Sequence, residues 1–176
     1  GCGSLALLGA LALGAGPWAD GATAGDYFYV GQSAAGSYWS DTGNWQPRSV
    51  PTFSGNLYFG EAVARLRSTN DLTPNLFFRT VTLSKPELFL AGQPIMVRYL
   101  EVENTTGTIT LDLGLRPLDT SPGGLDINKP SARGTLTISG DIGNPDRTIR
   151  VTSVGQVNLT GVLSGTGALI KEGGGR

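Results

Sequence analysis

The sequence GTLTISGDIGNPDRTIRVTSVGQVNLTGVL, residues 134–163, alternates aliphatic and polar residues in short runs that glycine or asparagine separates. Each run places a few aliphatic side chains on one face and threonine, asparagine or arginine on the other. A period of two residues predicts β-strands with one buried face. Short strands divided by turn residues are typical of all-β sandwiches, barrels and solenoids.

The same alternation extends toward the N-terminus. It predicts further strands at residues 57–59, 79–83, 88–90, 95–102 and 108–113, and the glycine and proline of residues 91–94 predict a turn. Residues 61–67, EAVARLR, differ from this pattern and predict a helix of one or two turns.

Aromatic and aliphatic residues are segregated along the chain. The three tryptophans precede position 46, whereas the clearest aliphatic alternation lies near the C-terminus. A sandwich usually has longer strands and an aromatic core, whereas a solenoid stacks short strands and needs a cap over its open end. We therefore predict a β-solenoid with an aromatic-rich N-terminal cap, residues 25–60, followed by coils over residues 61–176.

The composition excludes several classes of function. The chain has 13 basic and 14 acidic residues, so it lacks the basic excess of a nucleic-acid-binding protein. It has no histidine and a single cysteine, which excludes imidazole-based triads, histidine-ligated metals, internal disulfides and CxxC metal sites. We expect no catalytic site, no metal site and no cofactor.

The N-terminal residues predict an export signal. Residues 5–13 are uncharged and apolar, and they are shorter than the roughly 20 residues of a membrane-spanning helix. Ala22 and Ala24 fit the small-x-small pattern of signal peptidase, so residues 1–24 predict a signal peptide cleaved after Ala24. The alternative for this segment is a buried apolar helix.

The C-terminal sequence GVLSGTGALIKEGGG, residues 161–175, resembles the autotransporter-associated β-strand repeat of bacterial surface proteins. That repeat reads roughly L-S-G-x-G-x-L-x-K-x-G-x-G-x-L. The matching positions are Leu163, Ser164, Gly165, Gly167, Leu169, Lys171, Gly173 and Gly175. The sequence WSDTGNW, residues 39–45, is also similar to the W-S-x-x-x-N-W stretch in the leader region of these proteins.

This resemblance implies a right-handed parallel β-helix. It also implies a structural, exported, passenger-like or adhesin-like segment displayed at the cell surface, in the outer membrane or outside the cell. The partners expected from it are surface glycans or receptors on host or neighbouring cells. A translocating barrel or a C-terminal anchor is expected beyond Arg176.

A carbohydrate-binding or polysaccharide-active module is the alternative function. Tyr38, Trp39 and Trp45 are the candidates for a platform that stacks on sugars, although buried aromatic rings that close the solenoid explain the same cluster.

Glu101, Glu103 and Asp112, with Arg98 as the cation, are the candidate acids of a polysaccharide-cleaving site. An ordinary solvated strand face explains these charges more simply. The acidic turn that contains Asp141 is interpreted as turn capping and not as a calcium site.

Overall fold

The computed structural model describes residues 25–117, 124–143 and 146–176. It is nearly all β, with 52% strand and 2% helix, and forms a β-solenoid of about 5 turns. The predicted fold class, a solenoid that begins with an aromatic-rich cap, is confirmed. The predicted signal peptide, with Ala22 and Ala24, lies outside the described residues.

Over the described residues, the strands follow one another along the chain with a single short 3-10 helix, η1 (Thr42–Asn44). They are β1 (Asp26–Tyr29), β2 (Trp45–Gln46), β3 (Gly55–Phe59), β4 (Arg67–Asn70), β5 (Leu76–Leu83), β6 (Phe89–Val102), β7 (Thr108–Arg116), β8 (Gly124–Lys129), β9 (Thr135–Ile138), β10 (Ile142–Gly143), β11 (Thr148–Ser153), β12 (Gln156–Leu159), β13 (Leu163–Ser164) and β14 (Leu169–Glu172).

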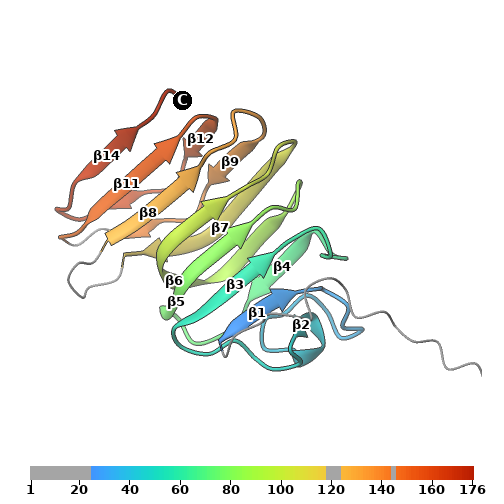
Figure 1. Ribbon diagram of the computed structural model, residues 1–176. Coiled ribbons are helices and arrows are strands. Elements are labelled where there is room, and N and C mark those ends of the chain that lie inside the picture. The colour runs from blue at the N-terminus through green and yellow to red at the C-terminus, as the bar shows by residue number, and fades with distance from the viewer. Residues whose placement is uncertain (1–24, 118–123, 144–145) are drawn as a thin grey trace, which may run out of the picture.

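The strands stack into three parallel strips that form the sides of the solenoid (Figure 1). The first strip runs through β1, β3, β5, β6, β8, β11 and β14. The second contains β4, β6, β7, β9 and β12, and the third contains β5, β6, β7, β10 and β13. Strands β5 and β7 each contribute to two strips and β6 contributes to all three, because these strands bend at corners. Among the described strands, only β1 and β2 pair antiparallel.

Aliphatic side chains in register form the core. The first strip stacks Tyr27, Leu57, Val81, Leu100, Ile127 and Val151 in one inward ladder, and all six are buried. A short strand cannot bury its apolar face alone, so each coil covers the inward side chains of the next. The stack therefore depends on register, because a shift of one residue would turn the aliphatic side chains outward.

The helix predicted over residues 61–67 is wrong. Residues 61–66 form turns and β4 begins at Arg67. Ala64 donates its backbone N–H to the carbonyl of Val30 at 2.9 Å, and Val63 inserts its side chain into the core. Seven residues hold too few helical hydrogen bonds to compete with these long-range partners.

The turn predicted at residues 91–94 is also wrong, because β6 continues through it from Phe89 to Val102. The chain bends there and its register against β7 shifts between Gly92 and Ile95. Gly92 has a φ of +107°, and a Cβ at this position would lie 2.2 Å from the carbonyl oxygen of Asn70 in the neighbouring coil. Glycine therefore lets the strand turn a corner without leaving the sheet.

Strands β12, β13 and β14 form the last coil in the chain. Its aliphatic side chains are partly uncovered, with Leu163 44% and Leu169 46% exposed. The equivalent ladder position in the preceding coil, Ile149, is fully buried beneath Leu169. The difference arises because a ladder residue needs a neighbour on both sides to lose its contact with water.

The ladder makes a direct prediction about stability. Leu100→Ala removes a side chain buried in the middle of the stack, so we expect unfolding to become easier by about 2–5 kcal/mol. Urea unfolding followed by circular dichroism measures this change. Thr110→Ala, on the outer face of β7, is the control and should change stability by less than about 0.5 kcal/mol. Equal effects of the two variants would contradict the assignment of the inward face.

Candidate functional site: the aromatic cap and an outer groove

Both tryptophans of the WSDTGNW segment lie inside the cap. Trp39 and Trp45 are 0% exposed, and their rings meet edge to face with centroids 5.8 Å apart. Trp45 donates its indole N–H to the carbonyl of Trp39 at 2.8 Å, and Trp39 donates its own to the Ser68 hydroxyl at 2.6 Å. Phe59 packs against both rings. Each buried indole N–H therefore has a partner, as burial requires.

The residues between the two tryptophans hold the loop in place. Asp41 caps η1 by accepting the backbone N–H of Gly43 at 2.9 Å. Asn44 is fully buried, and its amide donates to the carbonyls of Gly36 and Tyr38, both at 3.0 Å. The WSDTGNW segment thus supplies two core rings, the helix cap Asp41, and the Asn44 amide, which donates to two backbone carbonyls of the same loop.

The burial of these rings corrects the proposed sugar platform. Trp39 and Trp45 leave no ring face for a ligand, and of the three candidate platform residues only Tyr38, 50% exposed, reaches the surface. The indoles are buried because they cover the end of the aliphatic ladders, where Trp39 also contacts Phe78. The interpretation of this cluster as a cap is the one that agrees with the structure.

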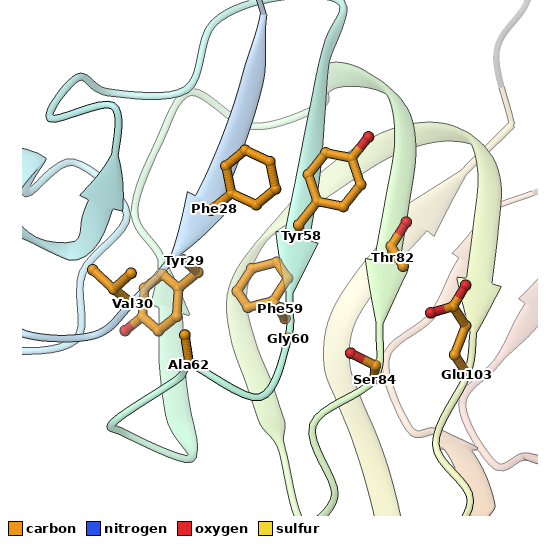
Figure 2. Close-up of a pocket in the computed structure, with 10 residues that line it drawn as sticks. All are labelled: Phe28, Tyr29, Val30, Tyr58, Phe59, Gly60, Ala62, Thr82, Ser84 and Glu103. Atoms are coloured by element: carbon orange, nitrogen blue, oxygen red, sulfur yellow. The ribbon is translucent and has the colours of Figure 1, made fainter. Parts of the chain in front are cut away.

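A different set of residues forms a groove on the outer face of the first strip. We call it the outer groove, and Figure 2 shows the residues that line it. It encloses about 90 Å³. Its lining comes from consecutive coils and consists of Phe28, Tyr29, Val30, Tyr58, Phe59, Gly60, Ala62, Thr82, Ser84 and Glu103.

One side of the outer groove is aromatic and the other is polar. The rings of Phe28 and Tyr58 lie nearly parallel, 17° apart, with centroids separated by 4.7 Å. Parallel register between β1 and β3 places these two residues directly beside each other. The side-chain oxygens of the other side come from Thr82 on β5 and from Ser84 and Glu103, which directly follow β5 and β6 (Figure 2).

The side-chain oxygens of the outer groove are available to a ligand. Within the described part of the chain, the side chains of Tyr58, Thr82, Ser84 and Glu103 make no hydrogen bond or ion pair. Burial, and secondarily the negative charge of Asp26, raise the pKa of Tyr58 above 10.0. Its hydroxyl is therefore protonated at neutral pH and can donate a hydrogen bond.

The candidate acids of a polysaccharide-cleaving site do not all lie together. Glu101 lies on the first strip and accepts the Asn128 amide at 2.8 Å, whereas Asp112 lies on the second strip and accepts the Ser139 hydroxyl at 2.8 Å. Asp112 therefore cannot pair with Glu101 or Glu103 across neighbouring coils. The guanidinium of Arg98 lies over the ring of Tyr99, 4.9 Å from its centroid.

In the acidic turn, the hydrogen bond described for the Asp141 side chain runs to the next coil and does not cap the turn itself. Asp141 accepts the backbone N–H of Val162 at 3.0 Å and so links two coils. Over residues 25–117, 124–143 and 146–176, no group of three or more acidic or cysteine residues is placed to hold a metal ion. Within the same residues, no helix has the length and apolar character needed to span a membrane.

Lys129 is a buried cation that the sequence analysis missed. It occupies the inward position of β8 beside Leu125 and Ile127, and it is 0% exposed. Its ammonium donates to the carbonyls of Arg133 at 2.8 Å, Ser131 at 3.3 Å and Asn104 at 3.4 Å. The alternation of residues 125–129 already placed Lys129 on the inward face, which was the signal available in the sequence.

The cap makes a prediction that separates a core role from a surface role. Trp45→Ala removes a buried ring and its hydrogen bond, so we expect a loss of about 3–5 kcal/mol in the free energy of unfolding. Tyr38→Ala, at a half-exposed position in the same loop, should cost less than about 1 kcal/mol. Chemical unfolding of both variants tests this, and a Trp45→Ala variant as stable as wild type would refute the structural role.

Lys129 gives stability a pH dependence of defined sign. Burial lowers the pKa of Lys129 in the folded chain below the ordinary 10.5 that the side chain has in the unfolded chain. At pH values between the folded-state and unfolded-state pKa, the unfolded chain therefore binds more protons than the folded chain. The contribution of Lys129 to the free energy of unfolding therefore increases as pH rises toward 10.5.

We expect the stability of wild type relative to Lys129→Met to increase with pH over this alkaline range, as measured by urea unfolding. Lys171→Met, at an exposed position, is the control for removing one lysine. A stability difference that stays flat or falls with pH would contradict the assignment.

In comparison with known proteins, no family model, no curated protein and no solved structure matches this chain.

Proposed function

We propose that this chain is a structural segment of an exported β-solenoid. The segment is passenger-like or adhesin-like and serves for display at the cell surface. The observation that supports this most is the inward ladder that continues from the cap into the last coil. Parallel backbone pairing and stacked aliphatic side chains make such a stack rigid along its axis. One end is closed by buried tryptophans, and the last coil leaves aliphatic ladder positions uncovered.

The outer faces also favour a structural role. The outward positions of the second strip stack threonine on threonine, with Thr108 beside Thr135 and Thr110 beside Thr137. Charged side chains on the outer face of the first strip form ion pairs between coils: Arg150 lies 3.9 Å from Asp126 and 3.6 Å from Glu172. These exposed ion pairs contribute little to stability and present no concentrated catalytic charge.

Export and surface display are supported by the predicted signal peptide and by the resemblance of residues 161–175 to the β-strand repeat of surface proteins. The expected partners are surface glycans or receptors on other cells. The carbohydrate-binding alternative keeps one specific support, the outer groove, which differs from the platform predicted at Tyr38, Trp39 and Trp45.

Surface display is tested with an epitope tag in the exposed turn between Ala34 and Ala35, introduced into the protein in the cells that make it. Antibody should bind the tag on intact cells. Added protease should leave a resistant fragment that contains the stacked strands, because their backbone groups are paired.

A Leu100→Asp variant, which places a charge in the ladder, is the control and should lose the resistant fragment. A tag found only after cells are lysed would overturn the proposal of surface display. If the wild-type chain were as sensitive to protease as the Leu100→Asp variant, the proposal that the stacked strands form a rigid solenoid would be overturned.

A further inference from the structure

The side chains of β7 and β9 do not by themselves fix the register between these two strands. Residues 108–111 of β7, TITL, lie beside residues 135–138 of β9, TLTI. If β9 slipped by two residues along β7, Thr135 would lie beside Thr110 and Leu136 beside Leu111. Side chains in a strand alternate with a period of two, so this slip keeps every aliphatic side chain inward. The choice of register therefore depends on contacts outside these two strands.

Lys129 supplies a contact between the two turns from which β7 and β9 start. Its ammonium donates to the carbonyls of Ser131 at 3.3 Å and Arg133 at 2.8 Å, both in the turn that precedes β9. The third acceptor is the carbonyl of Asn104 at 3.4 Å, in the turn that precedes β7. One buried side chain thus joins two successive coils at their corner.

A slip of β9 along β7 would break this contact. Ser131 and Arg133 would move with β9 while Asn104 stayed with β7, so the ammonium could not keep all three acceptors. Lys129 is 0% exposed, so water does not replace the lost acceptor. A buried charge that loses a partner is strongly destabilising, whereas the aliphatic contacts of the two registers are nearly equivalent. The ammonium therefore distinguishes two registers that the strands do not.

The following coil is fitted to the same side chain. Gly155 lies between β11 and β12, and a Cβ at this position would lie 3.1 Å from the Cε and 3.3 Å from the Nζ of Lys129. The same Cβ would lie 2.3 Å from the carbonyl oxygen of Ser131. A shift by two residues would bring Ser153 or Val157 to this place, and both carry the Cβ that the site excludes.

From these contacts we propose that Lys129 sets the register of the solenoid: its buried ammonium selects the observed stack of β9 on β7 over a stack slipped by two residues. The inward ladder supplies the burial, and Lys129 decides which positions of successive coils face each other. This goes beyond the structural role proposed above, because burial of the ladder alone accepts either register.

Cysteine pairs on the outer face of β7 and β9 test the proposal in the full chain carrying Cys2→Ser, which removes the one natural cysteine. Thr110→Cys with Thr137→Cys reports the observed register, because these positions are direct partners within disulfide reach. Thr110→Cys with Thr135→Cys reports the slipped register, because the observed one places these Cα atoms about 8 Å apart, beyond the roughly 7 Å limit for a disulfide. With Lys129 present, we expect brief oxidation to link the first pair at least about tenfold faster than the second.

Lys129→Met keeps a long side chain but removes the ammonium, so we expect linkage of the slipped pair relative to the direct pair to rise by about tenfold. Lys129→Gln keeps an amide donor and should give an intermediate ratio. Ile127→Met is the matched control, because it alters an inward residue of the same strand and keeps Lys129. It should leave the ratio unchanged. Mass spectrometry after alkylation measures the linked fraction, and circular dichroism shows which variants are folded.

A folded Lys129→Met variant with the wild-type ratio would overturn the proposal, and Lys129→Gln decides in the same way if Lys129→Met does not fold. Loss of the β signal in both variants would also overturn it, because Lys129 would then be needed for folding and not for the choice of register. An equal rise in the ratio for Ile127→Met would show that any change in β8 loosens the register, which contradicts the role given to Lys129. The surface-display test is independent of these outcomes, because it measures a tag on intact cells.

Discussion

A β-strand of a few residues cannot bury its apolar side chains unless an identical arrangement lies on each side of it. This constraint governs the whole molecule. It requires parallel register between coils, as in the ladder that includes Val81, Leu100 and Ile127. It also means that any coil without a neighbour exposes apolar side chains, as the partial exposure of Leu163 and Leu169 shows.

The aromatic cap covers the apolar side chains of the first coil, which has no neighbouring coil among the described residues on its N-terminal side. Trp39 and Trp45 bury large rings over the first coil while their indole N–H groups donate to a hydroxyl and a carbonyl. Two aromatic rings whose indole N–H groups have acceptors can cover the end of a ladder that aliphatic side chains alone would leave exposed to water. The same physical need explains why these rings are unavailable to a ligand.

Two places depart from the rule that inward positions are apolar and outward positions are polar. Lys129 points inward, where three backbone carbonyls replace the water that its ammonium loses. Phe28 and Tyr58 point outward beside unpaired oxygens. Lys129 has three backbone carbonyls as partners, whereas Phe28 and Tyr58 stack on each other across adjacent strands.

The sequence by itself determined the all-β solenoid, most of its strands and the aromatic cap, because a period of two and the position of the tryptophans are local properties of the chain. It did not determine that residues 91–94 bend within a strand or that residues 61–66 form turns, since Asn70 and Val30 impose these outcomes from neighbouring coils. The outer groove was equally hidden, because its residues, from Phe28 to Glu103, meet only when successive coils stack. Tertiary structure decided these features because register between coils sets which distant residues become neighbours.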